Sequence, residues 1–312
     1  MQLDSLSVNL IAQSTYQQPL LDQAVDRLLS SSAAAGTLRT AQVLLKPNLI
    51  TAGNGVLPCT DGRFIAAAAR WFLAQGARVA VGDSPSFGSA RAVLAAIGAL
   101  PSLQALGVSV VEFKQTRETV LPGGQKAAMA AAAMDCDLLV NLPRVKAHAQ
   151  MRVTLAVKNY FGCLSGFHKP WWHMAHGGTE GRFSALLVDL LAVLPASISL
   201  VDGIVAMHST GPIHGEPFPL GLIACGANPV AIDTALLSVL GINPAQSPLR
   251  QAACRAGIRG TDPAGLEFPL ARPAELGVRG FLVPESLSPI RFNPLRFVHN
   301  SMKRLQLRVL GR

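Results

Sequence analysis

Residues 42–85 read QVLLKPNLITAGNGVLPCTDGRFIAAAARWFLAQGARVAVGDSP, and this stretch decides the fold. It opens and closes with short runs that are apolar on both faces, at 42–47 and 78–82, and an alanine-rich helical pattern at 63–75 joins them. Strands that are apolar on both faces are typical of a sheet covered by helices on both sides. The stretch therefore predicts a strand–helix–strand unit whose two strands run parallel.

The same alternation extends along the chain in both directions. Further strands are predicted at 7–11, 108–113, 137–141, 198–202 and 221–225. Further helices are predicted at 19–31, 90–98, 126–134, 154–161, 182–194 and 229–240, and residues 164–181 and 241–285 are expected to be irregular. These elements predict an α/β fold with an open, largely parallel sheet and helices on both faces. We expect one domain of this kind over residues 1–285 and a basic amphipathic C-terminal helix within a tail at 286–312.

The composition excludes a disordered chain and argues against nucleic-acid binding. Hydrophobic residues make up 50% of the chain and charged residues 14%, which is the balance of a globular protein. The net charge of +9 comes mostly from the tail, because six of the 27 basic residues and no acidic residue lie beyond position 290. Residues 1–290 keep 21 basic against 18 acidic residues, so the body of the protein has no strong positive field for a polyanion.

The five cysteines, at positions 59, 136, 163, 225 and 254, form no local ligand set. Their spacing predicts neither a ferredoxin-type cluster nor a zinc knuckle, and we expect no disulfide. The first residues, MQLD, lack the basic and apolar regions of a signal peptide. The apolar stretch 183–207 is broken by Asp189, Pro195 and Asp202, which favours a buried helix and strand over a membrane span. We expect a cytoplasmic protein with reduced thiols; no metal is assigned, and the cofactor is unknown from the sequence.

Polar side chains recur where the predicted strands end. In an open parallel sheet, ligands bind beyond the carboxyl ends of the strands. Each of these residues alone is typical of a cap or a turn, but together they predict one shared cleft. The residues are Lys46, Asn48, Asp83, Lys146, His148 and Asp202.

The densest polar segment is 141–162, NLPRVKAHAQMRVTLAVKNYFG. It places Lys146 and His148 in a predicted loop, and Lys158 and Asn159 on the helix that follows. Cations beside a helix N-terminus are suited to an anion, although a solvated loop with surface lysines fits the pattern too. We also expect an aspartate within salt-bridge distance of a lysine.

Two histidine-containing stretches leave alternatives open. In HKPWWHMAHGG (168–178), His173 and His176 share a face if the segment is helical, which makes a metal site, a lid or ordinary surface histidines possible. In VDGIVAMHSTGPIHGEP (201–217), His214 lies in a glycine- and proline-bent loop that is either functional or a plain turn. We assign catalytic roles to Lys146, His148, Lys158, Asp83 and Asp202, and substrate binding to Lys46, Asn48, Asn159, His173 and His214.

Four segments together resemble the family of domain of unknown function 362. They are LKPNL (45–49), VGDSP (81–85), NLPRVKAH with VTLAVKN (141–148 and 153–159), and VDGIV with NPVAID (201–205 and 228–233). Many members of that family are described as iron–sulfur proteins with an additional ferredoxin-like module. This chain lacks the clustered cysteines of that module, so the resemblance implies the α/β domain without a cluster.

The sequence leaves three functions open. The first is an enzyme that binds a small anionic substrate or cofactor at the strand ends. The second is a redox or iron–sulfur-associated accessory protein. The third is a membrane-peripheral protein that uses the tail, where apolar residues recur every three or four positions between basic ones. The same tail pattern also fits self-association or packing on the protein's own body.

Overall fold

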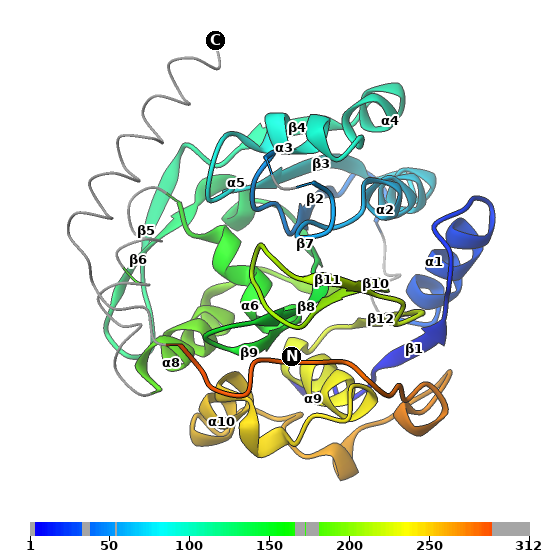
Figure 1. The fold of residues 1–312 in the computed structure, drawn as a ribbon. Helices are drawn as coiled ribbons and strands as arrows, with labels where there is room; N and C mark the ends of the chain where they lie inside the picture. Colours follow the sequence, from blue (N-terminus) through cyan, green and yellow to red (C-terminus); the bar gives the residue numbers. More distant parts are fainter. Residues whose placement is uncertain (1–3, 33–37, 54, 166–171, 173–180, 289–312) are drawn as a thin grey trace.

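A computed structural model describes residues 4–32, 38–53, 55–165, 172 and 181–288, and its centre is one mixed sheet (Figure 1). The strands lie in the order β1–β12–β10–β7–β2–β3–β4. Their bounds are β1 (Asn9–Ala12), β2 (Gln42–Pro47), β3 (Arg78–Asp83), β4 (Ser109–Glu112), β7 (Leu138–Leu142), β10 (Ser197–His208) and β12 (Leu222–Gly226). Neighbours from β10 to β4 pair in parallel, and β12 and β1 pair antiparallel at one edge. The predicted α/β fold with an open, largely parallel sheet is confirmed.

Helices cover both faces of the sheet because its strands are apolar on both sides. Val43 and Leu45 of β2 pack in one core, whereas Leu44, which points the other way, packs in a second core. The first core takes α1 (Leu20–Ser30), α2 (Gly62–Ala74) and α3 (Ala90–Ala96), and the short α4 (Leu100–Ala105) adds Leu103 to it. The opposite face takes α6 (Ala156–Asn159), α8 (Arg182–Asp189), α9 (Pro229–Val239) and α10 (Pro248–Arg255).

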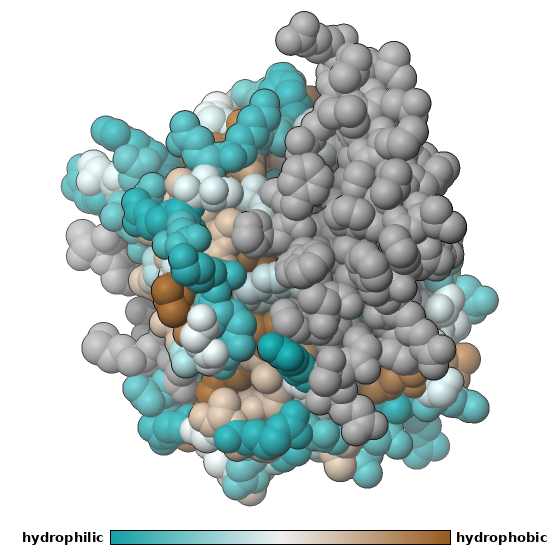
Figure 2. All heavy atoms as spheres, turned by 90° about the vertical axis from the view of Figure 1, so that its left-hand side faces the viewer, coloured by the Kyte–Doolittle hydropathy of each residue, from teal (hydrophilic) through white to brown (hydrophobic). Residues whose placement is uncertain are grey.

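The alanine-rich run at 126–134 departs from its prediction. It was expected to form a helix, but only α5 (Ala131–Met134) is helical, and β6 (Lys126–Ala130) pairs with β5 (Thr116–Val120) in a separate two-stranded sheet. Alanine favours a helix, yet strand pairing and the full burial of Ala127 outweigh that preference. Figure 2 shows the side of the molecule that carries β5 and β6, where hydrophilic and apolar residues lie beside each other.

The segment after β7 also differs from its prediction. Residues expected to form a loop form β8 (Arg144–His148), which pairs with β10 and with the short β9 (Arg152–Thr154). The helix predicted at 154–161 is divided into α6 and a 3-10 helix at Tyr160–Cys163. β10 extends beyond its predicted end to His208 and pairs there with β11 (Glu216–Phe218).

Two further expectations have clear outcomes. The stretch 183–207 forms α8, a 3-10 turn and β10, as a buried helix followed by a buried strand, and no helix in the described part of the chain could cross a membrane. Residues 241–285 contain α10, which the sequence reading missed. The basic tail from 289 onward lies outside the described residues.

Candidate functional site

The polar residues at the strand ends form a buried layer. Each of the following side chains belongs to a residue that is at most 3% exposed: Lys46, Asp83, Asn141, Arg144, Lys146 and Asp202. The loop that follows β2, residues 48–61, and the turn after β9 contribute hydrogen-bond partners to this layer. The predicted residues therefore lie largely beneath loops rather than on the wall of an open cleft.

The ends of β2 and β3 are joined by an ion pair between Lys46 and Asp83. The two charged groups lie 2.8 Å apart, and the second carboxylate oxygen accepts a hydrogen bond from the backbone of Leu49. Lys46 also donates to the carbonyl of Pro47 at 2.9 Å. The backbone of Gly162 lies against both charged groups, so that a Cβ there would clash with them. The expected aspartate–lysine contact is confirmed.

Two amide side chains connect this ion pair to the next strands. Asn159 of α6 donates to Asn141 of β7 at 2.8 Å, and its side-chain oxygen lies 3.5 Å from the Lys46 nitrogen. Asn141 in turn donates to the carbonyl of Ala156 and to the hydroxyl of Ser199, both at 3.0 Å. This chain of contacts fixes the predicted residue Asn159 beside Lys46.

Asp233 of α9 holds the start of α6 from the other side. Its carboxylate accepts the backbone N–H of Ala156 at 2.7 Å and also faces the N–H of Val157. Burial raises the pKa of Asp233 to about 8, and those two N–H groups act in the opposite direction. The sequence places Asp233 in the segment NPVAID (228–233), but its pattern did not predict this contact.

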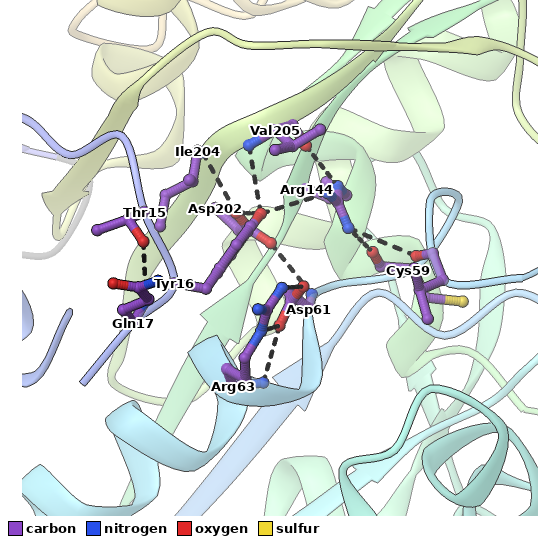
Figure 3. Close-up of polar contacts among 11 residues, drawn as sticks. Thr15, Tyr16, Gln17, Cys59, Asp61, Arg63, Arg144, Asp202, Ile204 and Val205 are labelled. Atoms are coloured by element: carbon purple, nitrogen blue, oxygen red, sulfur yellow. Dashed lines mark hydrogen bonds and ion pairs between the residues drawn. The ribbon is translucent and has the colours of Figure 1, made fainter.

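Asp202 belongs to a second network, drawn in Figure 3. Its carboxylate accepts the hydroxyl of Tyr16 at 2.7 Å and the backbone N–H of Asp61 at 3.1 Å. Arg144 donates to the same tyrosine hydroxyl at 3.2 Å. Burial raises the pKa of both Asp202 and Tyr16, and the positive charge of Arg144 opposes each shift. Tyr16 comes from a segment that carried no motif, so the sequence did not reveal it.

Three side-chain donors converge on the backbone of residues 56–59. Lys146 and Asn48 both donate to the carbonyl oxygen of Pro58, at 2.9 and 2.6 Å. Arg144 donates to the carbonyl of Cys59 at 2.8 Å and reaches that of Val56 at 3.4 Å. Two cations of β8 are thus bound to carbonyl oxygens of one short loop segment.

The ammonium group of Lys146 is buried with few partners. In the described part of the chain, the carbonyl of Pro58 is its only hydrogen-bond acceptor, although an ammonium has three donors. Burial lowers the pKa of Lys146 to about 7; Arg144 also lowers it, and Cys59 and Asp83 act in the opposite direction. Near neutral pH, this group therefore exists as both ammonium and free amine.

A pocket of about 400 Å³ is lined in part by Pro58. Besides that proline, its lining consists of Leu57, Ser209, Thr210, Ile213, His214, Gly215 and Glu216. Of the predicted substrate-binding residues, the exposed His214 lies on this pocket wall. Pro58 therefore both lines the pocket and accepts a hydrogen bond from Lys146 through its carbonyl oxygen.

The remaining predicted residues lie apart from this arrangement. The ring nitrogen Nδ1 of His148 accepts the backbone N–H groups of Gln150 and Met151, which closes the turn between β8 and β9. Lys158 is half-buried, with its nitrogen 4.5 Å from the centre of the Phe161 ring. His173 lies outside the described residues, so its role stays a prediction.

Neither a disulfide nor a metal-binding group is present in the part of the chain that the structure describes. All five cysteines lie in that part, and none of them forms a disulfide there. No three of the described histidine, cysteine, aspartate and glutamate side chains are grouped so that they could hold a metal ion.

Fold and site together define an open-sheet α/β protein with a layer of buried charged side chains at its strand ends. The chain belongs to the family described as domain of unknown function (DUF362), whose model matches residues 43–238. The resemblance seen in the four sequence segments is therefore confirmed. The chain is also 37% identical over 306 residues to "Thylakoid-associated protein sll1697" of Synechocystis sp., which covers 97% of this chain and 95% of that relative.

Two solved structures are more distant neighbours. The lactate racemase apoprotein from Thermoanaerobacterium thermosaccharolyticum is 12% identical, with a TM-score of 0.45, over 77% of this chain and 58% of that one. A protein from Thermotoga maritima is 10% identical, with a TM-score of 0.43, over 70% of this chain and 57% of that one. The chain spans less than two thirds of the length of each of these solved chains.

Proposed function

We propose that the protein is an enzyme that binds a small anionic substrate at the strand ends, beside Pro58. The observation that carries the proposal is the convergence of Asn48, Arg144 and Lys146 on the carbonyl oxygens of residues 56–59. An anionic oxygen is a stronger acceptor than a carbonyl oxygen for such donors. A substrate entering from the pocket would replace the carbonyl of Pro58 as the acceptor of Lys146 and Asn48.

The balance of buried charge supports an anion. Lys46, Arg144 and Lys146 supply three positive groups, and Asp83 and Asp202 supply two carboxylates in the same layer. When Lys146 is protonated, one positive charge is in excess. A buried unpaired charge is costly, and a bound anion would neutralise it.

The protonation of Lys146 supports catalysis rather than binding alone. With a pKa of about 7, the side chain can hold an anion as the ammonium and donate a proton to it near neutral pH. Lys46 is held by Asp83, and Asp202 by Tyr16, so we place these residues in support of the site. The general acid of this proposal is Lys146.

Calorimetric titration of the full-length protein with acetate and with inorganic phosphate tests the proposal. We expect Lys146→Met to weaken binding at least about tenfold, because a charge-assisted hydrogen bond is lost. The matched control is Lys126→Met, which removes an exposed lysine that pairs with Glu118 on β5. Binding that is absent in the wild type, or equal in Lys146→Met, contradicts the proposal.

A second function, association with an anionic membrane surface, is favoured by one observation. The relative that matches nearly the whole chain carries the name "Thylakoid-associated protein sll1697". The tail at 286–312 has six basic residues and no acidic residue, and its apolar residues follow an amphipathic pattern. This combination suits binding to anionic lipid. Membrane association of the tail and enzymatic activity of the α/β domain are compatible. Sedimentation with anionic liposomes distinguishes a membrane-bound protein from the cytoplasmic one expected from the sequence.

A further inference from the structure

We propose that the pocket beside Pro58 selects a zwitterionic substrate, a small compound with a carboxylate and an ammonium group like those of an amino acid. The carboxylate would face the Pro58 wall, and the ammonium would face Glu216. This inference rests on the proposed function, because it takes the anion site at Lys146 as given and identifies what else the substrate carries.

One residue of the pocket lining carries a negative charge. Glu216 is the only Asp, Glu, Lys or Arg among the residues that line the pocket in the described part of the chain. Its side chain is 73% exposed, so most of its surface remains open to solvent or to a ligand. A plain anion would be repelled by this group, whereas an ammonium would be attracted.

The protein neighbours of Glu216 leave its charge in place. Ser209 donates its hydroxyl to the carboxylate at 3.4 Å, and Nε2 of His208 lies 3.7 Å away. The other ring nitrogen of His208 accepts the backbone N–H of Leu282, so the proton of the neutral imidazole is on Nε2, toward Glu216. Two donors on one carboxylate leave acceptor capacity for an ammonium.

The Pro58 wall has the opposite character. The carbonyl oxygen of Pro58 accepts the side chains of Lys146 and Asn48, and Arg144 donates to the carbonyl of the next residue. The lining therefore carries a negative charge at Glu216, and the positively charged side chains of Lys146 and Arg144 are bound to the backbone at Pro58 and Cys59. A molecule with both charges matches the two walls at once, which a simple carboxylate or phosphate does not.

The volume and the remaining lining limit the size of the ligand. A pocket of about 400 Å³ is at the small end of ligand sites. Leu57 and Ile213 give it apolar surface between the polar walls. A short aliphatic spacer between the two charged groups fits this lining.

The test is calorimetric titration of the full-length protein with matched pairs of acids: glycine and acetate, β-alanine and propionate, 4-aminobutyrate and butyrate. Within the pair of the right length, we expect the amino-bearing acid to bind about tenfold tighter or more. Glu216→Gln should abolish that preference and, because the repulsion of the anion is removed, bind the plain acid at least as tightly as the wild type does. Glu118→Gln, a change at an exposed glutamate of β5, is the matched control and should keep the preference.

The outcomes separate this inference from the proposed function. Plain and amino-bearing acids that bind equally, with a dependence on Lys146, overturn the zwitterion and leave the anion site standing. A preference that survives in Glu216→Gln also overturns it. If no acid of any pair binds, the proposed function itself fails, and the inference fails with it.

Discussion

The nitrogen of Lys146 lies 2.9 Å from the carbonyl oxygen of Pro58, and that proline lines the pocket. One residue therefore contacts a buried cation and also lines the space in which a ligand would lie. The same carbonyl oxygen also accepts the side chain of Asn48 at 2.6 Å. The Pro58 carbonyl oxygen thus accepts two side-chain donors, and we assign its position to an anionic oxygen of the substrate.

Lys146→Met should change how stability depends on pH. The pKa of Lys146 in the fold is about 7, below the value of roughly 10.4 for a solvated lysine. Below pH 7 both states hold the proton and the fold bears the full cost of the buried charge; as pH rises toward 10, the folded state releases the proton first and gains stability. In chemical denaturation, Lys146→Met should be at least as stable as the wild type near about pH 6 and lose that advantage toward about pH 9. If the difference in unfolding free energy between the two proteins stays constant with pH, the pKa of Lys146 is not lowered by burial.

Asp233→Asn should change stability with the opposite sign. The pKa of Asp233 is about 8 in the fold, against roughly 3.9 for a solvated aspartate. Between these values the unfolded chain has released a proton that the folded protein still holds, so the stability of the wild type falls as pH rises from about 4 to 8. Denaturation curves should show Asp233→Asn gaining relative to the wild type over that range. No relative gain would mean that the carboxyl group is solvated.

Gly162→Ala should destabilise the fold through the Lys46–Asp83 ion pair. A Cβ at this position would clash with the charged atoms of both side chains, which are buried and cannot move aside freely. We expect a loss of about 1–3 kcal/mol in the free energy of unfolding. Gly265→Ala is the control, because a Cβ there meets open space and should cost less than about 0.5 kcal/mol. Equal stability of the two variants would show that the ion pair is loosely packed.

The tail prediction is tested by sedimentation with liposomes that contain phosphatidylglycerol. Full-length protein should sediment with them at low salt, and a protein that ends at Pro289 should stay in the supernatant. Six basic residues near anionic lipid contribute about 1 kcal/mol each at low salt. If both proteins stay in the supernatant, the membrane function is excluded and the cytoplasmic location is favoured.

The sheet could be predicted from the sequence because each strand has a local pattern that identifies it. Runs such as that of β2 are apolar on both faces, and only a sheet with two helical layers buries both. The run at 126–134 was wrongly predicted as a helix, because alanine favours a helix and a run of alanines shows no alternation of polar and apolar residues that would indicate a strand. Its pairing with β5 depends on contacts that are distant in sequence.

The site was predicted in part for a similar reason. Lys46, Asp83 and Lys146 stand directly after apolar runs, so topology brings them to one edge of the sheet. Tyr16 and Pro58 could not be predicted, because they reach the site through loops whose path no periodicity describes. The sequence also could not show that the loop after β2 covers these side chains.

Titration of the full-length protein with acetate across a range of pH tests the central claim most directly. If Lys146 binds the anion as an ammonium, affinity should be constant between about pH 5.5 and 6, where acetate is still ionised, and fall toward tenfold for each unit of pH above about 8. Lys146→Met should bind acetate weakly at every pH, and Lys126→Met should follow the wild type. An affinity for acetate that does not change with pH, or that persists in Lys146→Met, would contradict the account.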